Sequence, residues 1–326
     1  MKRALVGDIG GTNARFALWE NNQMHAVQVY ATADYTSPEQ AIGAYLQAQG
    51  LSKGDLGAVC LAVAGPVSGD EFRFTNNHWR LSRQAFCQSL QVEQLLLIND
   101  FTAMALGMTR LQAHEYRTVC QGTAQAGRPA VVIGPGTGLG VGTLLGLDDG
   151  RWIALPGEGG HVDLPVGNAR EAQIRQLIAN DAGHVSAETV LSGGGLLRLY
   201  QAICALDGYS ATLQTPAAIT EAALAGEPVA LAVIEQFCCF LGRVAGNNVL
   251  TLGGRGGVYI VGGIIPRFAE LFLRSGFARS FAEKGCMSGY FNEVPVWLVT
   301  AEFSGLLGAG VALQQSVGAG LPRDAI

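Results

Sequence analysis

The sequence predicts an α/β protein with two domains, and three observations support this. Short apolar runs of strand length recur along the chain, and stretches with helical spacing separate several of them. A glycine-threonine turn occurs twice, each time between two strand-like runs, which indicates two related halves. At 326 residues the chain is longer than a single hydrophobic core usually supports.

The first half is expected to alternate strands and helices. Its strands are predicted at residues 4–7, 14–18, 58–63 and 95–98. Its helices are predicted at residues 38–49, 82–90 and 101–111. We place the domain boundary near residue 111, where a polar stretch begins.

The second half is expected to be the larger and more helical one. Its strands are predicted at residues 130–133, 141–145, 258–261 and 294–299. Its helices are predicted at residues 171–180, 187–206 and 227–250. A last helix, beginning at residues 305–310, is expected to pack back on the first domain. The predicted domains are therefore residues 1–110 plus 302–326, and residues 111–301.

Composition narrows the class of protein. The net charge is −5, and 14% of residues are charged against 49% hydrophobic, which is typical of a compact globular protein without a nucleic-acid partner. The uncharged stretch 130–147 is broken by glycines and Pro135, so we expect a buried hairpin and no membrane anchor. Seven scattered cysteines and the lack of a signal peptide predict a cytoplasmic protein with reduced thiols.

The two glycine-threonine turns are candidate phosphate sites. The first is Gly10-Gly11-Thr12, and the second contains Thr137 and Gly138. Glycine lets backbone N–H groups approach a phosphate, and the threonine hydroxyl adds a donor. Asp8 would repel phosphate unless a cation lay between them, which favours Mg²⁺ with a nucleotide. Either turn alone is more often only a turn, but the pair favours a shared phosphate site, and neither turn has Walker A or Rossmann spacing.

Asn99 and Asp100 follow a predicted buried strand and precede a helical stretch. A carboxylate at the end of a parallel strand lies where α/β proteins bind ligands. The alternative is that the pair only caps the helix.

A second polar group lies in two glycine-containing loops. Glu158 and His161 lie in the first loop with Asp163, and Glu188 follows the second. Carboxylates and imidazole can bind several hydroxyls of a polyol. Two alternatives remain: Glu158, His161 and Asp163 could hold a metal, and Glu188 could belong to a helix capped by Ser186.

Six segments together resemble bacterial glucokinase of the non-zinc branch, in order and over nearly the whole chain. They are residues 8–15, 98–103, 136–140, 155–162, 183–188 and 260–267. The resemblance implies an actin-like ATPase (ribonuclease H-like) fold of two domains with a cleft between them. It also implies a cytoplasmic homodimer that uses ATP to phosphorylate D-glucose at its 6-hydroxyl, feeding glycolysis with glucose 6-phosphate.

The resemblance also implies roles for individual residues. Asp100 is implied as the general base, and the residues that hold the sugar are Asn99, Asp100, Glu158, His161 and Glu188. Asp8 would act on Mg²⁺ through water. The remaining residues implied to bind ATP are Gly10, Gly11, Thr12, Asn13, Thr137, Gly138, Gly262 and Gly263. Pro135 departs from the family pattern and lacks an N–H donor, so we assign it no phosphate contact.

Three other classes of protein are alternatives. The related repressor and kinase group carries a cysteine-rich zinc motif after the sugar loop, and residues 162–186 contain no cysteine, so we expect no structural zinc. A sugar-responsive regulator would need a DNA-binding segment, and only residues 1–3 precede the first strand. An actin-like ATPase that remodels proteins would not need the sugar-binding set.

Overall fold

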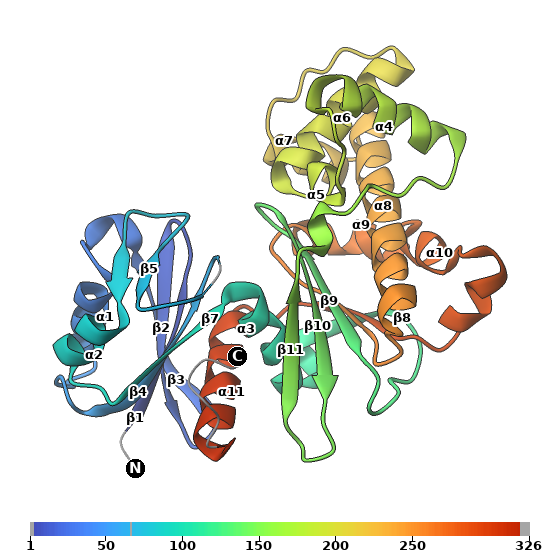
Figure 1. Ribbon diagram of the computed structural model, residues 1–326. Helices are drawn as coiled ribbons and strands as arrows, with labels where there is room; N and C mark the ends of the chain where they lie inside the picture. The colour runs from blue at the N-terminus through green and yellow to red at the C-terminus, as the bar shows by residue number, and fades with distance from the viewer. Residues whose placement is uncertain (1–2, 66, 320–326) are drawn as a thin grey trace. The chain divides into compact units, whose positions relative to one another are not determined.

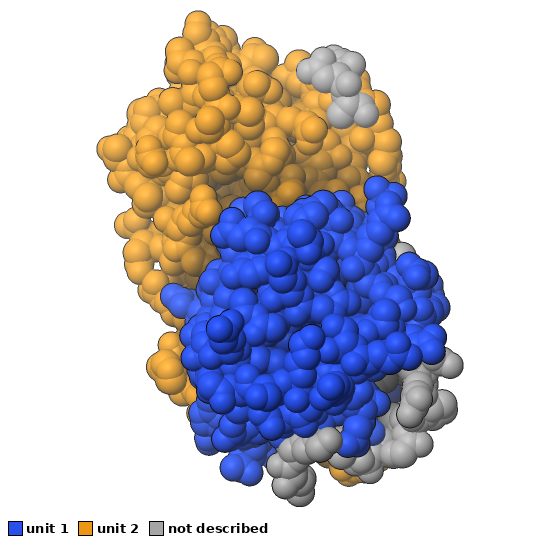
Figure 2. Space-filling model, turned by 90° about the vertical axis from the view of Figure 1, so that its left-hand side faces the viewer, with its two compact units in different colours: residues 1–111, 151–156, 301–326 blue, residues 112–150, 157–300 orange. Residues whose placement is uncertain are grey.

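The computed structural model describes residues 3–65 and 67–319 and is drawn in Figure 1. The chain divides into two compact units, which Figure 2 shows in different colours. Unit 1 comprises Met1–Leu111, Arg151–Pro156 and Ala301–Ile326, and unit 2 comprises Gln112–Gly150 and Gly157–Thr300. Of the predicted first domain, residues 1–2, 66 and 320–326 lie outside the described residues.

Unit 1 is built on a sheet with the strand order β3-β2-β1-β4-β7. The strands are β1 (Arg3–Ile9), β2 (Asn13–Glu20), β3 (Gln23–Ala31), β4 (Leu56–Val63) and β7 (Gln94–Asn99). β1 and β2 form an antiparallel hairpin, whereas β1, β4 and β7 run parallel. The predicted strands are confirmed. β3 was missed because it is an edge strand with mostly exposed or half-buried residues, so it lacks an apolar run.

The described part of unit 1 also contains a short hairpin and several α-helices. The hairpin strands are β5 (Glu71–Arg73) and β6 (Arg80–Ser82), and the helices are α1 (Pro38–Ala48), α2 (Arg83–Leu90), α3 (Asp100–Gly107) and α11 (Ser304–Ala319). Ser37 and Ser82 cap α1 and α2 with their side chains, which explains why these helices begin where they do. α3 is shorter than the predicted 101–111, because a 3₁₀ turn at Met108–Arg110 follows it.

The last helix belongs to unit 1 and lies beside α3 (Figure 1). Two glycines allow this close approach. A Cβ at Gly107 would collide with the carbonyl of Ser304, and one at Gly308 would collide with the carbonyl of Ala103. A side chain at either position would therefore push the two helices apart.

Unit 2 repeats the arrangement of a hairpin beside parallel strands. Its strands run in the order β10-β9-β12-β13-β8, with β9 (Ala130–Pro135) antiparallel to β10 (Leu139–Gly146). β12 (Val258–Ile260) and β13 (Val296–Val299) run parallel to β9, and β8 (Tyr116–Cys120) is antiparallel to β13. β8 was not predicted, and neither was β11 (Trp152–Gly157), which lies mostly in unit 1. β8 lies in the polar stretch that we took for a domain boundary.

The helices of unit 2 are α4 (Ala169–Ala182), α5 (Ala187–Val190), α6 (Gly193–Asp207), α7 (Pro216–Leu224), α8 (Pro228–Leu252), α9 (Ala269–Arg274) and α10 (Phe277–Ala282). The prediction of one helix over 187–206 was wrong, because the chain breaks after Val190 and α6 starts again with Ser192 as its cap. α8 has the length and apolar character of a membrane span, but 72% of its most apolar window is buried within the structure. It is the core helix of this unit.

Candidate active site

The first glycine-threonine turn joins β1 to β2 in unit 1. The amide of Gly10 donates to the carbonyl of Asn13 at 2.9 Å, which closes the turn. A Cβ at Gly11 would lie 2.9 Å from the carbonyl oxygen of Asn76, so only glycine fits there without displacing backbone. Thr12 is exposed at the tip. The turn can therefore offer backbone amides and a hydroxyl to an anion.

Asp8 lies near the end of β1, just before this turn. Its carboxylate accepts from the Nη1 of Arg15 across the hairpin at 3.4 Å. Burial raises the pKa of the Asp8 carboxyl, Arg15 opposes that rise, and the nearby charge of Asp100 adds to it. Two neighbouring carboxylates repel one another, and a bound divalent cation would offset this repulsion. Carboxylate and water oxygens are the ligands that Mg²⁺ prefers, so these residues fit it.

Asn99 and Asp100 lie where β7 passes into α3. The Oδ1 of Asn99 accepts from the amides of Phe101 and Thr102 at 2.9 and 3.1 Å, so the helix-cap interpretation is correct. Asp100 is the first residue of α3, and the residue as a whole is exposed. Loss of surrounding water raises the pKa of Asp100, while the Phe101 amide and the Asn99 side chain oppose the rise. Capping does not exclude a role in chemistry, because the cap is the side chain of Asn99 and Asp100 is an exposed residue.

The second glycine-threonine turn joins β9 to β10 in unit 2. The amide of Gly136 donates to the carbonyl of Gly138 at 2.7 Å, and the carbonyl of Gly136 accepts from the amide of Gly193 at 2.9 Å. The turn is also held by Glu188, whose Oε2 accepts from the amide of Leu139 at 2.8 Å. A Cβ at Gly138 would collide with that same carboxylate oxygen.

Glu188, His161 and Glu158 lie in a row in unit 2. The Nδ1 of His161 lies 3.9 Å from Glu188 Oε1, and its Nε2 lies 3.9 Å from Glu158 Oε2. Glu158 and His161 are largely exposed, at 91% and 60% of their side chains, whereas Glu188 is 34% exposed. Glu188 is in the first turn of α5, which Ser186 caps as the alternative predicted, and its carboxylate is nevertheless turned toward the phosphate turn and His161.

Backbone pairing holds together the two loops that precede α4 and α5. The amide of Ala187 donates to the carbonyl of Val162 at 2.8 Å, and the amide of Leu164 donates to the carbonyl of Val185 at 3.0 Å. The Oδ1 of Asp163 lies 3.5 Å from the Nδ1 of His184. Among residues 3–65 and 67–319, no group of three His, Cys, Asp or Glu side chains is arranged to hold a metal.

Gly262 and Gly263 follow β12 and lie beside the end of β9. Gly262 has a φ of 89°, and a Cβ there would lie 2.5 Å from the carbonyl oxygen of Pro135. Gly263 has open space on its Cβ side. Gly262 is thus the residue that lets this loop approach the second phosphate turn.

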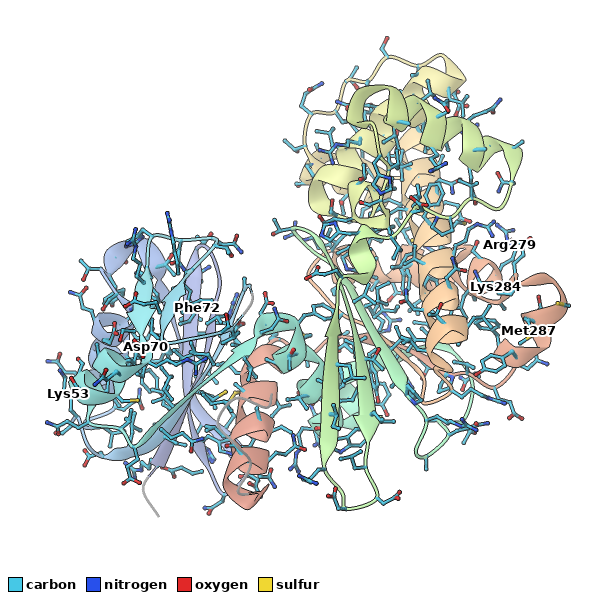
Figure 3. All side chains as sticks on the ribbon, viewed as in Figure 1. Lys53, Asp70, Phe72, Arg279, Lys284 and Met287 are labelled. Atoms are coloured by element: carbon cyan, nitrogen blue, oxygen red, sulfur yellow. The ribbon has the colours of Figure 1, made fainter. Side chains whose placement is uncertain are left out.

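A buried ion pair that was not predicted from the sequence holds the segment after His161. The Nε of Arg243 in α8 donates to the Oε2 of Glu171 at 2.8 Å, and their side chains are 8% and 2% exposed. Glu171 also accepts from the amide of Gly167 at 2.6 Å. Lys284, labelled in Figure 3, donates to the carbonyl of Arg243, and burial lowers its pKa to about 8. An arginine inside an otherwise apolar helix was the available signal.

The structure thus brings together two separate sets of predicted residues. Unit 1 groups Asp8, Gly10, Gly11, Thr12, Asn13, Asn99 and Asp100 at the ends of β1 and β7. Unit 2 groups Thr137, Gly138, Glu158, His161, Glu188 and Gly262 around the second turn. Each set pairs a phosphate-type turn with groups suited to a hydroxylated substrate.

Fold comparison defines the class of the protein. The crystal structure of a glucokinase from an Antarctic psychrotroph matches with a TM-score of 0.89 at 36% identity, covering 97% of this chain and 100% of that one. A ROK family glucokinase from Streptomyces griseus, solved with glucose and AMPPNP, matches with a TM-score of 0.64 at 20% identity over 96% of this chain and 99% of that one. The chain has the actin-like ATPase fold of the sugar kinases.

Sequence comparison then identifies the family. A family model described as Glucokinase matches residues 5–316. The glucokinase of Pseudomonas paraeruginosa is 56% identical over 317 residues, 97% of this chain and 94% of that protein. The glucokinase of Erwinia tasmaniensis is 41% identical over 320 residues, 97% of this chain and 98% of that protein. The chain belongs to the glucokinase family, which confirms the resemblance drawn from its motifs.

Proposed function

We propose that this protein transfers the γ-phosphoryl group of ATP to the 6-hydroxyl of D-glucose, giving glucose 6-phosphate and ADP. The observation that carries the proposal is the 56% identity to a glucokinase along almost the entire chain. The glycine-threonine turn of each unit and the row of Glu188, His161 and Glu158 support it, because the reaction needs a nucleotide site and a polyol site.

We propose that Glu158, His161, Glu188 and Asn99 bind the sugar. The carboxylates accept hydrogen bonds from hydroxyls, while imidazole and amide groups both donate and accept. A sugar that lacks one hydroxyl would leave a polar group of the site without a partner, which is a strong basis for selectivity. The largely exposed side chains of Glu158 and His161 are available for this binding.

Asp100 is proposed as the general base. The 6-hydroxyl gives its proton to the Asp100 carboxylate as its oxygen bonds to the γ-phosphorus, and the bond from that phosphorus to the ADP oxygen breaks. The raised pKa of Asp100 makes it a stronger base than an ordinary aspartate.

The nucleotide is proposed to bind at the two turns. Gly10, Gly11, Thr12 and Asn13 of the first turn and Thr137 and Gly138 of the second would face the phosphates, while Gly262 and Gly263 would lie near the adenosine. Asp8 would hold Mg²⁺ through water, and the bound ion would neutralise phosphate charge.

The first experiment measures ADP release from Mg-ATP without sugar and with saturating glucose, fructose, mannose or N-acetylmannosamine. Release that depends on glucose is the expected result. A preference for another sugar would replace glucose as the substrate, and release that is independent of sugar would favour an ATPase that remodels proteins.

Replacing Asp100 with asparagine tests the general base. We expect kcat to fall by roughly 10²- to 10⁴-fold, while glucose binding measured by calorimetry is largely retained. The wild-type rate should also fall as the pH is lowered through the raised pKa of Asp100, because the protonated carboxyl cannot accept the proton. Asp34→Asn, at an exposed position of unit 1, is the matched control. Near-normal turnover of Asp100→Asn would mean that another group is the base.

We also propose that the protein is a cytoplasmic homodimer. All seven cysteines lie in the described part of the chain, where none of them forms a disulfide, and this fits a reducing compartment. Light scattering of the purified protein tests the dimer, since a mass of one chain at micromolar concentration would contradict it.

A further inference from the structure

We propose that Asn77 and Thr32 are positioning residues, which shape the first phosphate turn by binding its carbonyl groups. The inference rests on the proposed function, because it assumes that this turn binds the phosphates of ATP. Neither residue belongs to the predicted site, and both lie outside the motifs on which the family resemblance rests.

The carbonyl of Gly10 is held by Asn77. The Nδ2 of Asn77 donates to the Gly10 oxygen at 3.0 Å, and its Oδ1 accepts from the amide of Trp79 at 2.9 Å. Both ends of the Asn77 amide are therefore used. The side chain forms a fixed link from the turn to Trp79.

The next two carbonyls are held by Thr32. Its Oγ1 donates to the carbonyl of Gly11 at 2.8 Å, and its amide donates to the carbonyl of Thr12 at 2.9 Å. Thr32 is 3% exposed, so its hydroxyl has little access to water as an alternative partner. Three consecutive carbonyls of the turn are thus bound by two residues.

These bonds determine where the amides of the turn point. In a trans peptide the carbonyl and the following N–H point in opposite directions, and the described peptides contain no cis bond. The amides of Gly11 and Thr12 consequently point away from Asn77 and Thr32. Within the described residues, neither amide donates to a protein acceptor. Amides fixed in this way are ready to bind an anion without reorganising.

The segments that carry Asn77 and Thr32 are held to one another through Trp79. Trp79 is fully buried, and its Nε1 donates to the carbonyl of Tyr35 at 2.8 Å, three residues after Thr32. Trp79 also packs edge-on against Phe74, with ring centroids 6.0 Å apart. Phe74 packs in turn on Phe72, which Figure 3 labels. Asn77 and Thr32 are therefore connected to a buried aromatic cluster of unit 1 that contains Phe72, Phe74 and Trp79.

Two substitutions remove the donor while preserving shape. Thr32→Val deletes the hydroxyl that binds Gly11, and Asn77→Asp deletes the Nδ2 donor to Gly10 while keeping the acceptor for Trp79. We expect each to raise the Kd of Mg-ADP, measured by calorimetry, and the KM of Mg-ATP by about tenfold. The Kd of glucose without nucleotide should stay within about twofold of wild type, because no sugar-binding group moves.

Matched controls separate this effect from a general loss of structure. Thr118→Val on β8 and Asn292→Asp make the same chemical changes at exposed positions of unit 2 and should leave both constants unchanged. Thr32→Ser keeps the hydroxyl and should restore nucleotide affinity. If Thr32→Ser is as weak as Thr32→Val, or if both bracing variants bind Mg-ADP normally, the proposal is wrong.

The same measurements separate failure of this proposal from failure of the proposed function. If the wild-type protein prefers another sugar or hydrolyses ATP without sugar, the glucose assignment fails, while the Mg-ADP constants of the variants still test the braces. If wild type binds no Mg-ADP at all, both proposals fail together.

Discussion

The two glycine-threonine turns of this protein, which we propose to bind phosphate, are held in different ways. In unit 1, the carbonyls of the turn are bound by Asn77 and Thr32, which are not among the groups proposed to touch substrate. In unit 2, the turn is bound by Glu188, whose other carboxylate oxygen faces His161. The first turn is therefore supported from outside the site, and the second is supported by the site itself.

This difference predicts how changes at each turn affect the two substrates. Loss of a brace in unit 1 should weaken nucleotide binding alone. Loss of Glu188 should weaken both nucleotide and sugar, because one carboxylate serves the Leu139 amide and the row of His161 and Glu158. Because Glu188 serves both sets of groups, a bound sugar should stabilise the second turn. The formed turn should in return strengthen the binding of the sugar.

Glu188→Ala is expected to give the largest effect. It removes a charge-assisted acceptor from Leu139 and a partner of His161, so the KM values of glucose and Mg-ATP should both rise, each by roughly 10- to 100-fold. Glu188→Gln retains an acceptor oxygen for Leu139, so it should restore Mg-ATP more than glucose. Steady-state kinetics with each substrate varied in turn would measure both.

The control for Glu188 is Glu221→Ala, an exposed glutamate of α7 in the same unit. If Glu188→Ala changes only the glucose constant, Glu188 is not a support of the phosphate turn, and the contrast between the two units disappears.

Adding a methyl group to each turn should give a smaller effect of the same kind. In Gly138→Ala the new Cβ collides with the Glu188 carboxylate, whereas in Gly11→Ala it lies 2.9 Å from the carbonyl oxygen of Asn76. We expect a change of about fivefold in both KM values for Gly138→Ala. For Gly11→Ala the change should be similar but confined to Mg-ATP.

Two further glycines provide controls for these substitutions. Gly43 in α1 and Gly194 in α6 have no heavy atom within 4 Å of an added Cβ, so alanine should be tolerated at both. An unchanged glucose KM in Gly138→Ala would show that the carboxylate of Glu188 moves aside without affecting the sugar row.

The sequence predicted the parts of this site that depend on local pattern. Both phosphate hairpins, the parallel strands beside them and the cap at Asn99 follow from apolar runs and turn residues a few positions apart. The braces could not be predicted, because Asn77 is 67 residues from Gly10, and Thr32 is 21 residues from Gly11. The buried pair of Arg243 and Glu171 spans 72 residues. Such contacts are set by tertiary packing, which periodicity does not encode.

The last and smallest expected effect concerns the carboxylates beside the first turn. Because burial raises the pKa of Asp8, the folded ligand-free protein binds more protons there than the unfolded chain does. The free-energy penalty of the charged Asp8 carboxylate is fully present above the pKa that this group has in the folded protein. The penalty is relieved as the pH falls toward the ordinary pKa of an aspartate. Asp8→Asn should therefore unfold at a higher temperature than wild type near pH 7, and this advantage should shrink as the pH is lowered toward 4.

Scanning calorimetry at several pH values measures this difference, with Asp34→Asn as the exposed control. The lost contact with Arg15 works against the gain, but at 3.4 Å between partly exposed side chains it contributes little. An advantage of Asp8→Asn that grows as the pH falls would contradict the assigned cause. Glu188→Gln keeps an acceptor oxygen for the amide of Leu139 but loses the charge that strengthens this hydrogen bond, so it should not stabilise unit 2. If Asp8→Asn is more stable than wild type but has lost turnover, the first turn retains a carboxylate that destabilises the fold. The proposed role of Asp8 with Mg²⁺ would be the reason for retaining it.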